Sequence, residues 1–384
     1  MTILSTKWRG YLAALIGMTL LTGFSPATYA QSITNTGALS LDTNAADPAV
    51  FLGFTDNNGF DCLLWNRYYN SVWAWSVETA PGPNVCGPGG SITTGVFATT
   101  YSLGSARHYV AFRMNRNGVL LEADDGFTKP RIYTSQYIFG GPGAGAYVVG
   151  ATTAQNTGGA QPFAFLHTGA ALWSSSWNGT AFVWTNHGTP SGVGISLAVG
   201  TLAVASGSNA QPYAFVVGSD GNLWSRWWNG SVWSWTSHGS PTPGIASAVG
   251  TTIIFSGTRP FIYVIGKDGN LWSRSYSGGW VWYNHGKPSG VNLVNTMGAT
   301  CGNNCTQPFA FLSGSDGNLW SDSWNGSAWV WTNHGKPAGI TLGASIGATA
   351  VSNSRPYVFL FGSDGNVWLR YWSGSAWGWY SLGI

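Results

Sequence analysis

Hydrophobic and polar residues alternate in short runs along most of the chain, and glycine-containing dipeptides separate the runs. In the stretch 212–237, "PYAFVVG", "LWSRWW" and "VWSWTS" are separated by Asp220-Gly221 and Asn229-Gly230. Such dipeptides between alternating apolar runs are strong signals for β-hairpin turns. A Gly/Pro-rich link then leads to "ASAVGTTIIF" (246–255), a run of small and β-branched residues. The pattern predicts four antiparallel strands and almost no helix.

This four-strand pattern recurs. The tryptophan that ends "DGNLW" or its equivalent falls at 173, 224, 272, 320 and 368, at intervals of 48 to 51 residues. Trp65 and Leu121 hold the equivalent place upstream, at intervals of 56 and 52. Periods near this length are typical of propellers and solenoids. The sequence therefore predicts an all-β, seven-bladed β-propeller of four-stranded antiparallel blades. The repeats lie near 47–106, 107–160, 161–210, 211–258, 259–306, 307–354 and 355–384, each preceded by a small-residue inner strand.

Residue size supports the same architecture. The runs "LAVGTLAV" (197–204) and "SIGATAV" (345–351) suit the crowded axis of a propeller, whereas the tryptophan-rich strands suit the wide outer gaps. Most of the 23 tryptophans are therefore expected to pack between blades. The ring is expected to close by packing the first blade on the last, with no shared blade.

The first thirty residues have the features of a cleaved secretory signal peptide. Lys7 and Arg9 precede an apolar run at 11–21, and "TYA" ends at Ala30. We therefore expect residues 31–384 to form a single propeller that is secreted, or periplasmic if it is retained. No second apolar run of similar length follows, so membrane insertion is not expected.

The composition narrows the function classes. Only 8% of the residues are charged while 15% are aromatic, which excludes a disordered chain. Without Lys7 and Arg9 the formal charge falls from +3 to +1, so there is no electrostatic case for binding nucleic acid.

Four cysteines in an exported chain indicate disulfides. Cys301 and Cys305 in "CGNNC" are expected to pair across a tight loop, and Cys62 with Cys86 around an insertion. A metal site is the alternative, but the histidines do not cluster near these cysteines. We expect neither a metal nor another cofactor.

The unit at 355–380 reads "RPYVF", "GSDGNVW" and "YWSGSAWGWY". It resembles the repeat of the PLL-type seven-bladed bacterial lectins, the fucose-binding family described from Photorhabdus. The likeness is close over 161–384 and faint over 47–155. It implies sugar sites between blades, where aromatic rings stack on the sugar and polar groups hold its hydroxyls. It also implies oligomers and no catalysis.

The chain departs from that family at two positions. Arginine often stands where the family commonly has asparagine, and the family's "NQG" turn is "NHG" or "SHG" here. The resemblance therefore supports sugar binding in general more strongly than it supports fucose as the sugar. Fewer than seven working sites are expected. The candidate ligand-binding residues are Trp177, Trp228, Tyr276, Trp324, Trp372, Arg226, Arg274, Arg370, His238, His285 and His334.

Each class of candidate has a structural alternative. The arginine guanidinium groups offer several N–H donors beside aromatic rings and could bind a sugar. Alternatively, they could stack on tryptophan with a purely structural role. The histidines could lie at the rim of an inter-blade groove and bond a sugar hydroxyl, or could hold a turn by bonding a nearby carbonyl. The aspartates of "DGN" are expected to be turn residues.

Two other functions compete with a lectin that binds glycans or glycoconjugates on cell surfaces. A sialidase-like glycosidase needs a pair of carboxylates, and after Asp125 the only acid outside the four turns is Asp322. A non-catalytic scaffold for protein–protein interaction would not need aromatic and donor positions that recur from blade to blade. Trp177, Trp228, Tyr276, Trp324 and Trp372 do recur, which favours a sugar-binding protein that is not an enzyme.

Overall fold

The computed structural model describes residues 38–40, 48–56, 61–69, 72–78, 90–93, 96–103, 106–114, 120–124, 134–143, 145–156, 159–351 and 355–383. Every regular element in these segments is a β-strand, and none of them contains a helix suited to crossing a membrane. The predicted signal segment at 1–30 and Cys86 lie outside the described residues, as does the side chain of Cys62.

The strands form consecutive sheets. The first half of the chain contributes β1 (Ala38–Ser40), β2 (Pro48–Asp56), β3 (Asp61–Tyr69), β4 (Val72–Glu78), β5 (Gly90–Thr93), β6 (Val96–Leu103), β7 (Ala106–Met114), β8 (Leu120–Asp124), β9 (Thr134–Ile138), β10 (Tyr147–Asn156), β11 (Gly159–His167), β12 (Leu172–Trp177) and β13 (Phe182–Gly188). The remainder contributes β14 (Ile195–Ser206), β15 (Asn209–Gly218), β16 (Leu223–Trp228), β17 (Trp233–Gly239), β18 (Ile245–Ile254), β19 (Arg259–Gly266), β20 (Leu271–Tyr276), β21 (Trp280–Gly286), β22 (Leu293–Gly302), β23 (Gln307–Gly314), β24 (Leu319–Trp324), β25 (Trp329–Gly335), β26 (Leu342–Val351), β27 (Arg355–Gly362), β28 (Val367–Trp372) and β29 (Trp377–Gly383).

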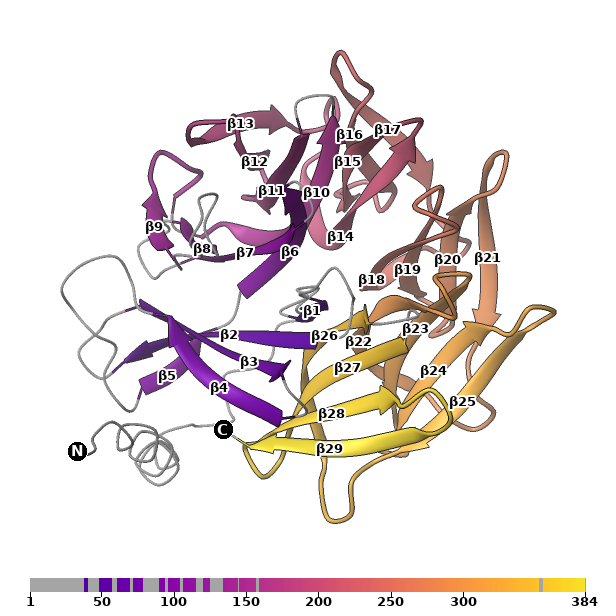
Figure 1. The fold of residues 1–384 in the computed structure, drawn as a ribbon. Coiled ribbons are helices and arrows are strands. Elements are labelled where there is room, and N and C mark those ends of the chain that lie inside the picture. The colour runs from indigo at the N-terminus through magenta and orange to yellow at the C-terminus, as the bar shows by residue number, and fades with distance from the viewer. Residues whose placement is uncertain are drawn as a thin grey trace, which may run out of the picture.

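Consecutive strands pair antiparallel in each sheet, as in β18-β19-β20-β21, β22-β23-β24-β25 and β26-β27-β28-β29. The β10–β13 and β14–β17 sheets share one point of backbone pairing, that of Gln155 with Ala210. Figure 1 shows the sheets standing side by side around a centre, with β6, β10, β14, β18, β22 and β26 innermost. This arrangement is that of a β-propeller, which confirms the predicted all-β architecture.

The innermost strands carry the small residues that the crowded centre requires. Gly298 has a φ of 116°, and a Cβ added there would lie 3.2 Å from the backbone nitrogen of Ala348 on the next sheet. Threonine hydroxyls bridge neighbouring sheets, because Thr201 donates to the carbonyl of Ala151 and Thr251 donates to that of Thr201, both at 2.8 Å. These strands surround a cavity of about 590 Å³.

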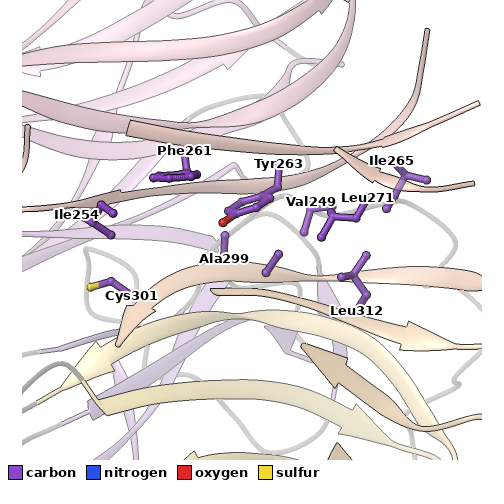
Figure 2. Close-up of a cluster of buried hydrophobic side chains, with 10 residues drawn as sticks. Val249, Ile254, Phe261, Tyr263, Ile265, Leu271, Ala299, Cys301 and Leu312 are labelled. Carbon is purple, nitrogen blue, oxygen red and sulfur yellow. The ribbon is translucent and has the colours of Figure 1, made fainter. Parts of the chain in front are cut away.

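Buried apolar clusters fill the gaps between sheets. Figure 2 shows the cluster between β18–β21 and β22–β25, which includes Phe261, Tyr263 and Leu312. Cys301 also belongs to this cluster and forms the predicted disulfide with Cys305, their Cα atoms 4.8 Å apart.

Tryptophans on the outermost strands tie the four sheets from β14 to β29 to the sheet that precedes each of them. Trp235 Nε1 donates to the carbonyl oxygen of His187 at 3.3 Å, and the repeat reproduces this bond further along the chain. Equivalent bonds join Trp282 to His238, Trp331 to His285 and Trp379 to His334.

The same bond links the first sheet to the last. Trp75 Nε1 on β4 donates to the carbonyl of Leu382 on β29 at 3.0 Å. Val50 and Leu52 of β2 pack in one cluster with Phe359, and Figure 1 shows the indigo β2–β4 beside the yellow β28 and β29. This is the contact expected of a ring that closes by packing rather than by sharing a sheet.

The aspartates of the "DGN" turns have the predicted structural role. Asp220 Oδ1 accepts hydrogen bonds from the backbone nitrogen of Asn222 at 3.0 Å and from Trp224 Nε1 at 3.2 Å. Asp268, Asp316 and Asp364 repeat this arrangement.

Candidate functional site

The candidate site lies in the gaps between neighbouring sheets. Because alternate residues of a strand face opposite sides, Ser176 on β12 faces the β14–β17 sheet, and Arg226 and Trp228 on β16 face back toward it. We name each gap after the residue equivalent to Ser176 in the sheet that precedes it. The described chain thus has Ser176, Trp227, Ser275, Ser323 and Tyr371 gaps, in chain order.

The Ser176 gap opens into a cavity of about 390 Å³. This volume is within the range of about 300–1,000 Å³ that is usual for small-molecule sites. Its lining combines polar side chains with two indole rings. The residues concerned are Gln161, Phe163, Ser174, Ser176, Thr185, Asn209, Gln211, Trp228 and Trp233, together with Ala154, Gln155, Ala210, Pro212 and Gly230.

Two tryptophans form the aromatic wall of this cavity. Trp228 ends β16 and Trp233 begins β17, so the intervening hairpin places their ring centroids 5.8 Å apart at an interplanar angle of 59°. Trp233 packs against Phe163 of the preceding sheet, with ring centroids 6.0 Å apart, while Trp228 is only half-buried. The ring pair recurs as Trp177–Phe182, Tyr276–Trp280, Trp324–Trp329 and Trp372–Trp377.

The predicted arginines lie deeper on the same strand faces and stack on tryptophan. The Arg226 guanidinium carbon is 5.5 Å from the centroid of Trp235. Arg274 lies equally far from Trp282, and Arg370 is 5.3 Å from Trp379. The buried Nε of each of these arginines has no hydrogen-bond partner among the described residues. Arg226 belongs to the Ser176 gap but does not line its cavity.

The predicted histidines do not lie at a rim. His238 and His334 are only 4% and 5% exposed, and the His285 side chain is fully buried. His238 Nε2 is 2.9 Å from Ser225 Oγ in the same sheet, and Trp280 of the next sheet covers its ring at 4.4 Å. The expected rim position is therefore wrong, because the neighbouring sheet's tryptophan covers the end of the outer strand. The imidazole bonds a serine rather than a carbonyl.

The buried histidines are kept neutral. Burial, with a smaller effect of Arg226, lowers the pKa of His187 to about 3. Burial and Arg274 lower the pKa of His238 to about 4, and burial and Arg370 lower that of His334 to about 3. In all three, Nδ1 is buried without a hydrogen-bond partner.

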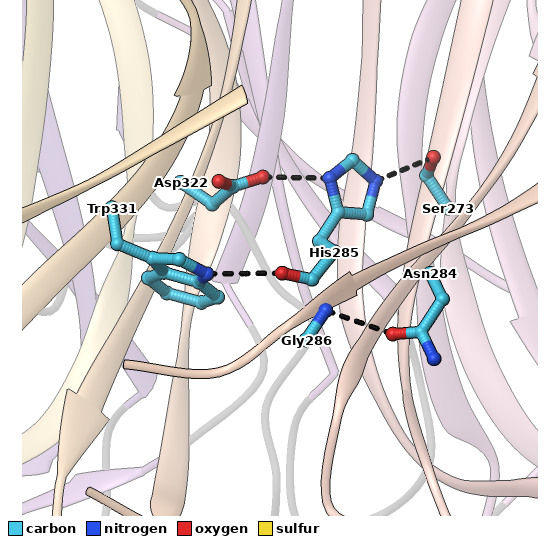
Figure 3. A network of polar contacts seen from close by, with 6 residues as sticks. All are labelled: Ser273, Asn284, His285, Gly286, Asp322 and Trp331. Carbon is cyan, nitrogen blue, oxygen red and sulfur yellow. Dashed lines mark hydrogen bonds and ion pairs between the residues drawn. The ribbon is translucent and has the colours of Figure 1, made fainter. Parts of the chain in front are cut away.

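The Ser275 gap replaces arginine with an acid. Asp322 Oδ2 lies 2.7 Å from His285 Nδ1, and His285 Nε2 lies 2.8 Å from Ser273 Oγ, as Figure 3 shows. Ser273 and Asp322 are 1% and 0% exposed. Burial raises the pKa of Asp322, although His285 opposes the shift. The order of groups matches a hydrolytic triad, but their burial denies any substrate access to the serine.

The structure thus divides the predicted residues. Trp228 lies at a cavity, whereas Arg226 is near it and His238 is in the packing between sheets. Sequence reasoning missed the polar wall, above all Gln161, Gln211 and Ser176. The recurrence of glutamine or arginine just before proline at 161, 211, 259, 307 and 355 was the available signal.

Comparisons with known proteins identify the fold. No protein-family model matches the chain, and no curated protein sequence matches it either. Among solved structures, the BP39L lectin of Burkholderia pseudomallei is similar with a TM-score of 0.60 and 18% identity, over 91% of this chain and 99% of that one.

The lectin of the fungus Aleuria aurantia is also similar, with a TM-score of 0.50 and 17% identity, over 75% of this chain and 96% of that one. Its structure is described as a six-bladed β-propeller with a novel mode of fucose recognition. A second structure of it, at 16% identity, contains α-methyl-L-fucoside, with a TM-score of 0.50 and the same coverage. At these identities the likeness establishes the fold.

Proposed function

We propose that this protein is a non-catalytic lectin that binds fucose or a related sugar in the gaps between its blades. The observation that carries the proposal is the Ser176 gap, in which Trp228 and Trp233 meet Gln161, Gln211 and Thr185 around one cavity. Two structures of the Aleuria aurantia lectin, which shares the fold, concern fucose recognition or contain a fucoside.

The chemistry of the lining suits a monosaccharide. A sugar presents an apolar face of C–H groups that packs on an aromatic ring, and its edge of hydroxyls needs donors and acceptors. Trp228 offers the ring, because it is half-buried and supported by Trp233. Glutamine amides and serine or threonine hydroxyls can both donate and accept. Arg226, whose guanidinium stacks on Trp235 deeper in the same gap, is proposed as a further donor.

Three finer proposals follow from this one. The sheets β1–β4, β6–β9, β10–β13, β14–β17, β18–β21, β22–β25 and β26–β29 support a seven-bladed ring of the PLL type. The segment 1–30 supports export to the cell exterior or periplasm. Several weak sites on one rigid ring would attach the protein by avidity to fucosylated glycans on cell surfaces, and association of copies would add to that avidity.

The test is a titration of the mature protein with α-methyl-L-fucoside, after a glycan array has ranked fucosylated glycans against others. We expect saturable binding that Trp228→Ala weakens at least tenfold at the Ser176 gap, by analogy with the stacking of nucleic-acid bases on aromatic side chains, which contributes about 1–3 kcal/mol per base. Arg226→Ala is expected to weaken it less.

Val294→Ala is the control, because that side chain is 60% exposed and belongs to no cavity lining described above. It should bind as the unaltered protein does. A folded protein that binds no glycan would overturn the lectin proposal and favour a propeller scaffold for a protein partner.

A further inference from the structure

One position on the third strand of the sheets from β10 to β29 separates the five gaps named above into two kinds. It is serine in Ser176, Ser275 and Ser323, and aromatic in Trp227 and Tyr371. In the Ser176 gap this position lines the cavity together with Phe163 and Thr185. Phe163 is the cross-strand neighbour of Ser176. Tyr213 is the neighbour of Trp227, and Tyr357 that of Tyr371.

The indole of Trp227 covers the positions that are open in the Ser176 gap. It stacks on Tyr213 with centroids 5.2 Å apart and an interplanar angle of 8°. Its Nε1 donates to Thr236 Oγ1 at 3.0 Å. Tyr213 and Thr236 are the equivalents of Phe163 and Thr185. One ring therefore spans the floor of the gap and holds itself there by stacking and a hydrogen bond.

The opposite wall approaches the same rings. Burial raises the pKa of Tyr213 to about 12, and Tyr276 of the next sheet contributes to the shift. Tyr276 is the counterpart of Trp228 and is 42% exposed. The hydroxyl of Tyr213, on the sheet that precedes this gap, thus lies within electrostatic reach of Tyr276 on the sheet that follows it. The side chain of Trp227 lies in the gap between these two sheets.

Tyr371 fills the gap between the last and first sheets in the same way. It stacks on Tyr357 with centroids 5.6 Å apart and an interplanar angle of 28°. Gly378 on β29 provides room for it, because a Cβ there would lie only 3.0 Å from the tyrosine ring.

We propose that Trp227 and Tyr371 are built-in occupants that close their gaps to sugar, so that the ring binds sugar only where serine stands in their place. This inference rests on the proposed function and specifies which of its sites work. It also means that the platform residue Tyr276, although it repeats the pattern of Trp228, serves no ligand.

The Ser323 gap is assigned as the second working site, because it repeats the Ser176 gap almost residue for residue. Phe309, Ser323, Thr332, Arg370, Trp372 and Trp377 replace Phe163, Ser176, Thr185, Arg226, Trp228 and Trp233. The main difference is Arg355 in place of Gln211, and Arg355 Nη1 donates to the carbonyl of Ser373 at 2.9 Å.

The test exchanges the two native pairs of residues. Tyr213→Phe with Trp227→Ser copies the Phe163–Ser176 pair into the Trp227 gap, and Phe163→Tyr with Ser176→Trp makes the reverse change. Native mass spectrometry counts the α-methyl-L-fucoside molecules bound per chain. We expect one more site than in the unaltered protein for the first variant and one fewer for the second.

Unchanged stoichiometry in both folded variants, with binding by the unaltered protein, would overturn the inference and leave the lectin proposal intact. Loss of binding by Tyr276→Ala would also overturn it. Binding by neither the unaltered protein nor its variants would instead overturn the proposed function.

Thiol labelling decides the closure of the gap without any sugar. Thr185→Cys and Thr236→Cys place single thiols at equivalent positions, in a chain whose described cysteines are disulfide-bonded. Thr236→Cys should react with N-ethylmaleimide at least tenfold more slowly than Thr185→Cys. Adding Trp227→Ser should restore its rate. Equal rates in the two single variants would show that Trp227 does not close the gap.

Discussion

The Ser176 and Ser275 gaps are built from one repeat but place groups of opposite charge beside their buried histidine. In the Ser176 gap, His187 faces Arg226 and its Nδ1 has no hydrogen-bond partner. In the Ser275 gap, Asp322 stands in the arginine's place and contacts His285 Nδ1 at 2.7 Å. The outer frame is the same in both, because the histidine carbonyl accepts a hydrogen bond from the next tryptophan at 3.3 Å or 3.1 Å.

A second substitution accompanies the change of charge. In the sheets from β10 to β29, Phe165, Phe215, Phe311 and Phe359 occupy one buried position, and Tyr263 stands at that position in the Ser275 gap. Burial, with a contribution from Asp322, raises the pKa of Tyr263 well above its ordinary value. In the Ser275 gap, Asp322 replaces the arginine and Tyr263 replaces the phenylalanine. This gap therefore buries polar groups where the Ser176 gap packs a phenylalanine ring near an arginine. The Ser275 gap is therefore specialised for its internal network.

Acid should reveal the largest difference between the two kinds of gap. The unfolded chain takes up a proton at each histidine near pH 6.5, whereas the folded chain does so only near pH 3 at His187 and His334 and near pH 4 at His167 and His238. Stability from these groups is therefore complete above pH 6.5 and is lost as the pH falls. At pH 4 the loss is about 3 kcal/mol for each histidine. Chemical denaturation at pH 7 and pH 4 measures it.

Asp322 should act in the other direction. Because burial raises its pKa above 3.8, the folded chain protonates it at a higher pH than the unfolded chain does, and acidification favours folding at this position. The Tyr371 gap supplies a matched control, since Leu369 and Leu382 stand there for the serine and histidine. Ser225→Leu with His238→Leu should reduce the acid-induced loss by about one quarter, because it removes one of four similar contributions, those of His167, His187, His238 and His334. An unaltered pH profile would contradict this account.

Asp322→Ala should be the most damaging single change in the two gaps at neutral pH. It leaves His285 Nδ1 buried without its carboxylate, and removing one partner of a buried pair typically costs about 3–5 kcal/mol. Arg226→Ala should cost about 1 kcal/mol, since that half-buried guanidinium loses mainly its stacking on Trp235. Denaturant midpoints of the two variants measure the contrast.

The double change Asp322→Arg with Tyr263→Phe keeps this comparison falsifiable. It gives the Ser275 gap the arginine and phenylalanine that stand in the Ser176 gap. Its free energy of unfolding should be higher than that of Asp322→Ala. If Asp322→Ala and Arg226→Ala were equally stable, the buried network would have no special role.

The sequence predicted the strands and turns because their determinants are local. Asp220-Gly221 sets a hairpin whatever surrounds it, and the alternation along 223–228 assigns each side chain to a face. It did not predict the depth of His238, since depth depends on Trp280 of another sheet. For the same reason the sequence identified Trp228 and Tyr276 as equivalent platforms. Whether each faces open space depends on Ser176 or Trp227, which belong to the preceding sheet.

The smallest expected difference between the two gaps concerns the outer frame that they share. Trp235→Phe and Trp331→Phe each remove a hydrogen bond to a histidine carbonyl, and each should cost about 1 kcal/mol plus a similar packing loss. The two losses should be equal, because a backbone carbonyl accepts the same bond whatever the imidazole faces. Double variants with Arg226→Ala and Asp322→Ala then measure the coupling in each gap. A larger loss for Trp331→Phe that disappears in the Asp322→Ala background would mean that the frame and the buried network form one cooperative unit in the Ser275 gap alone.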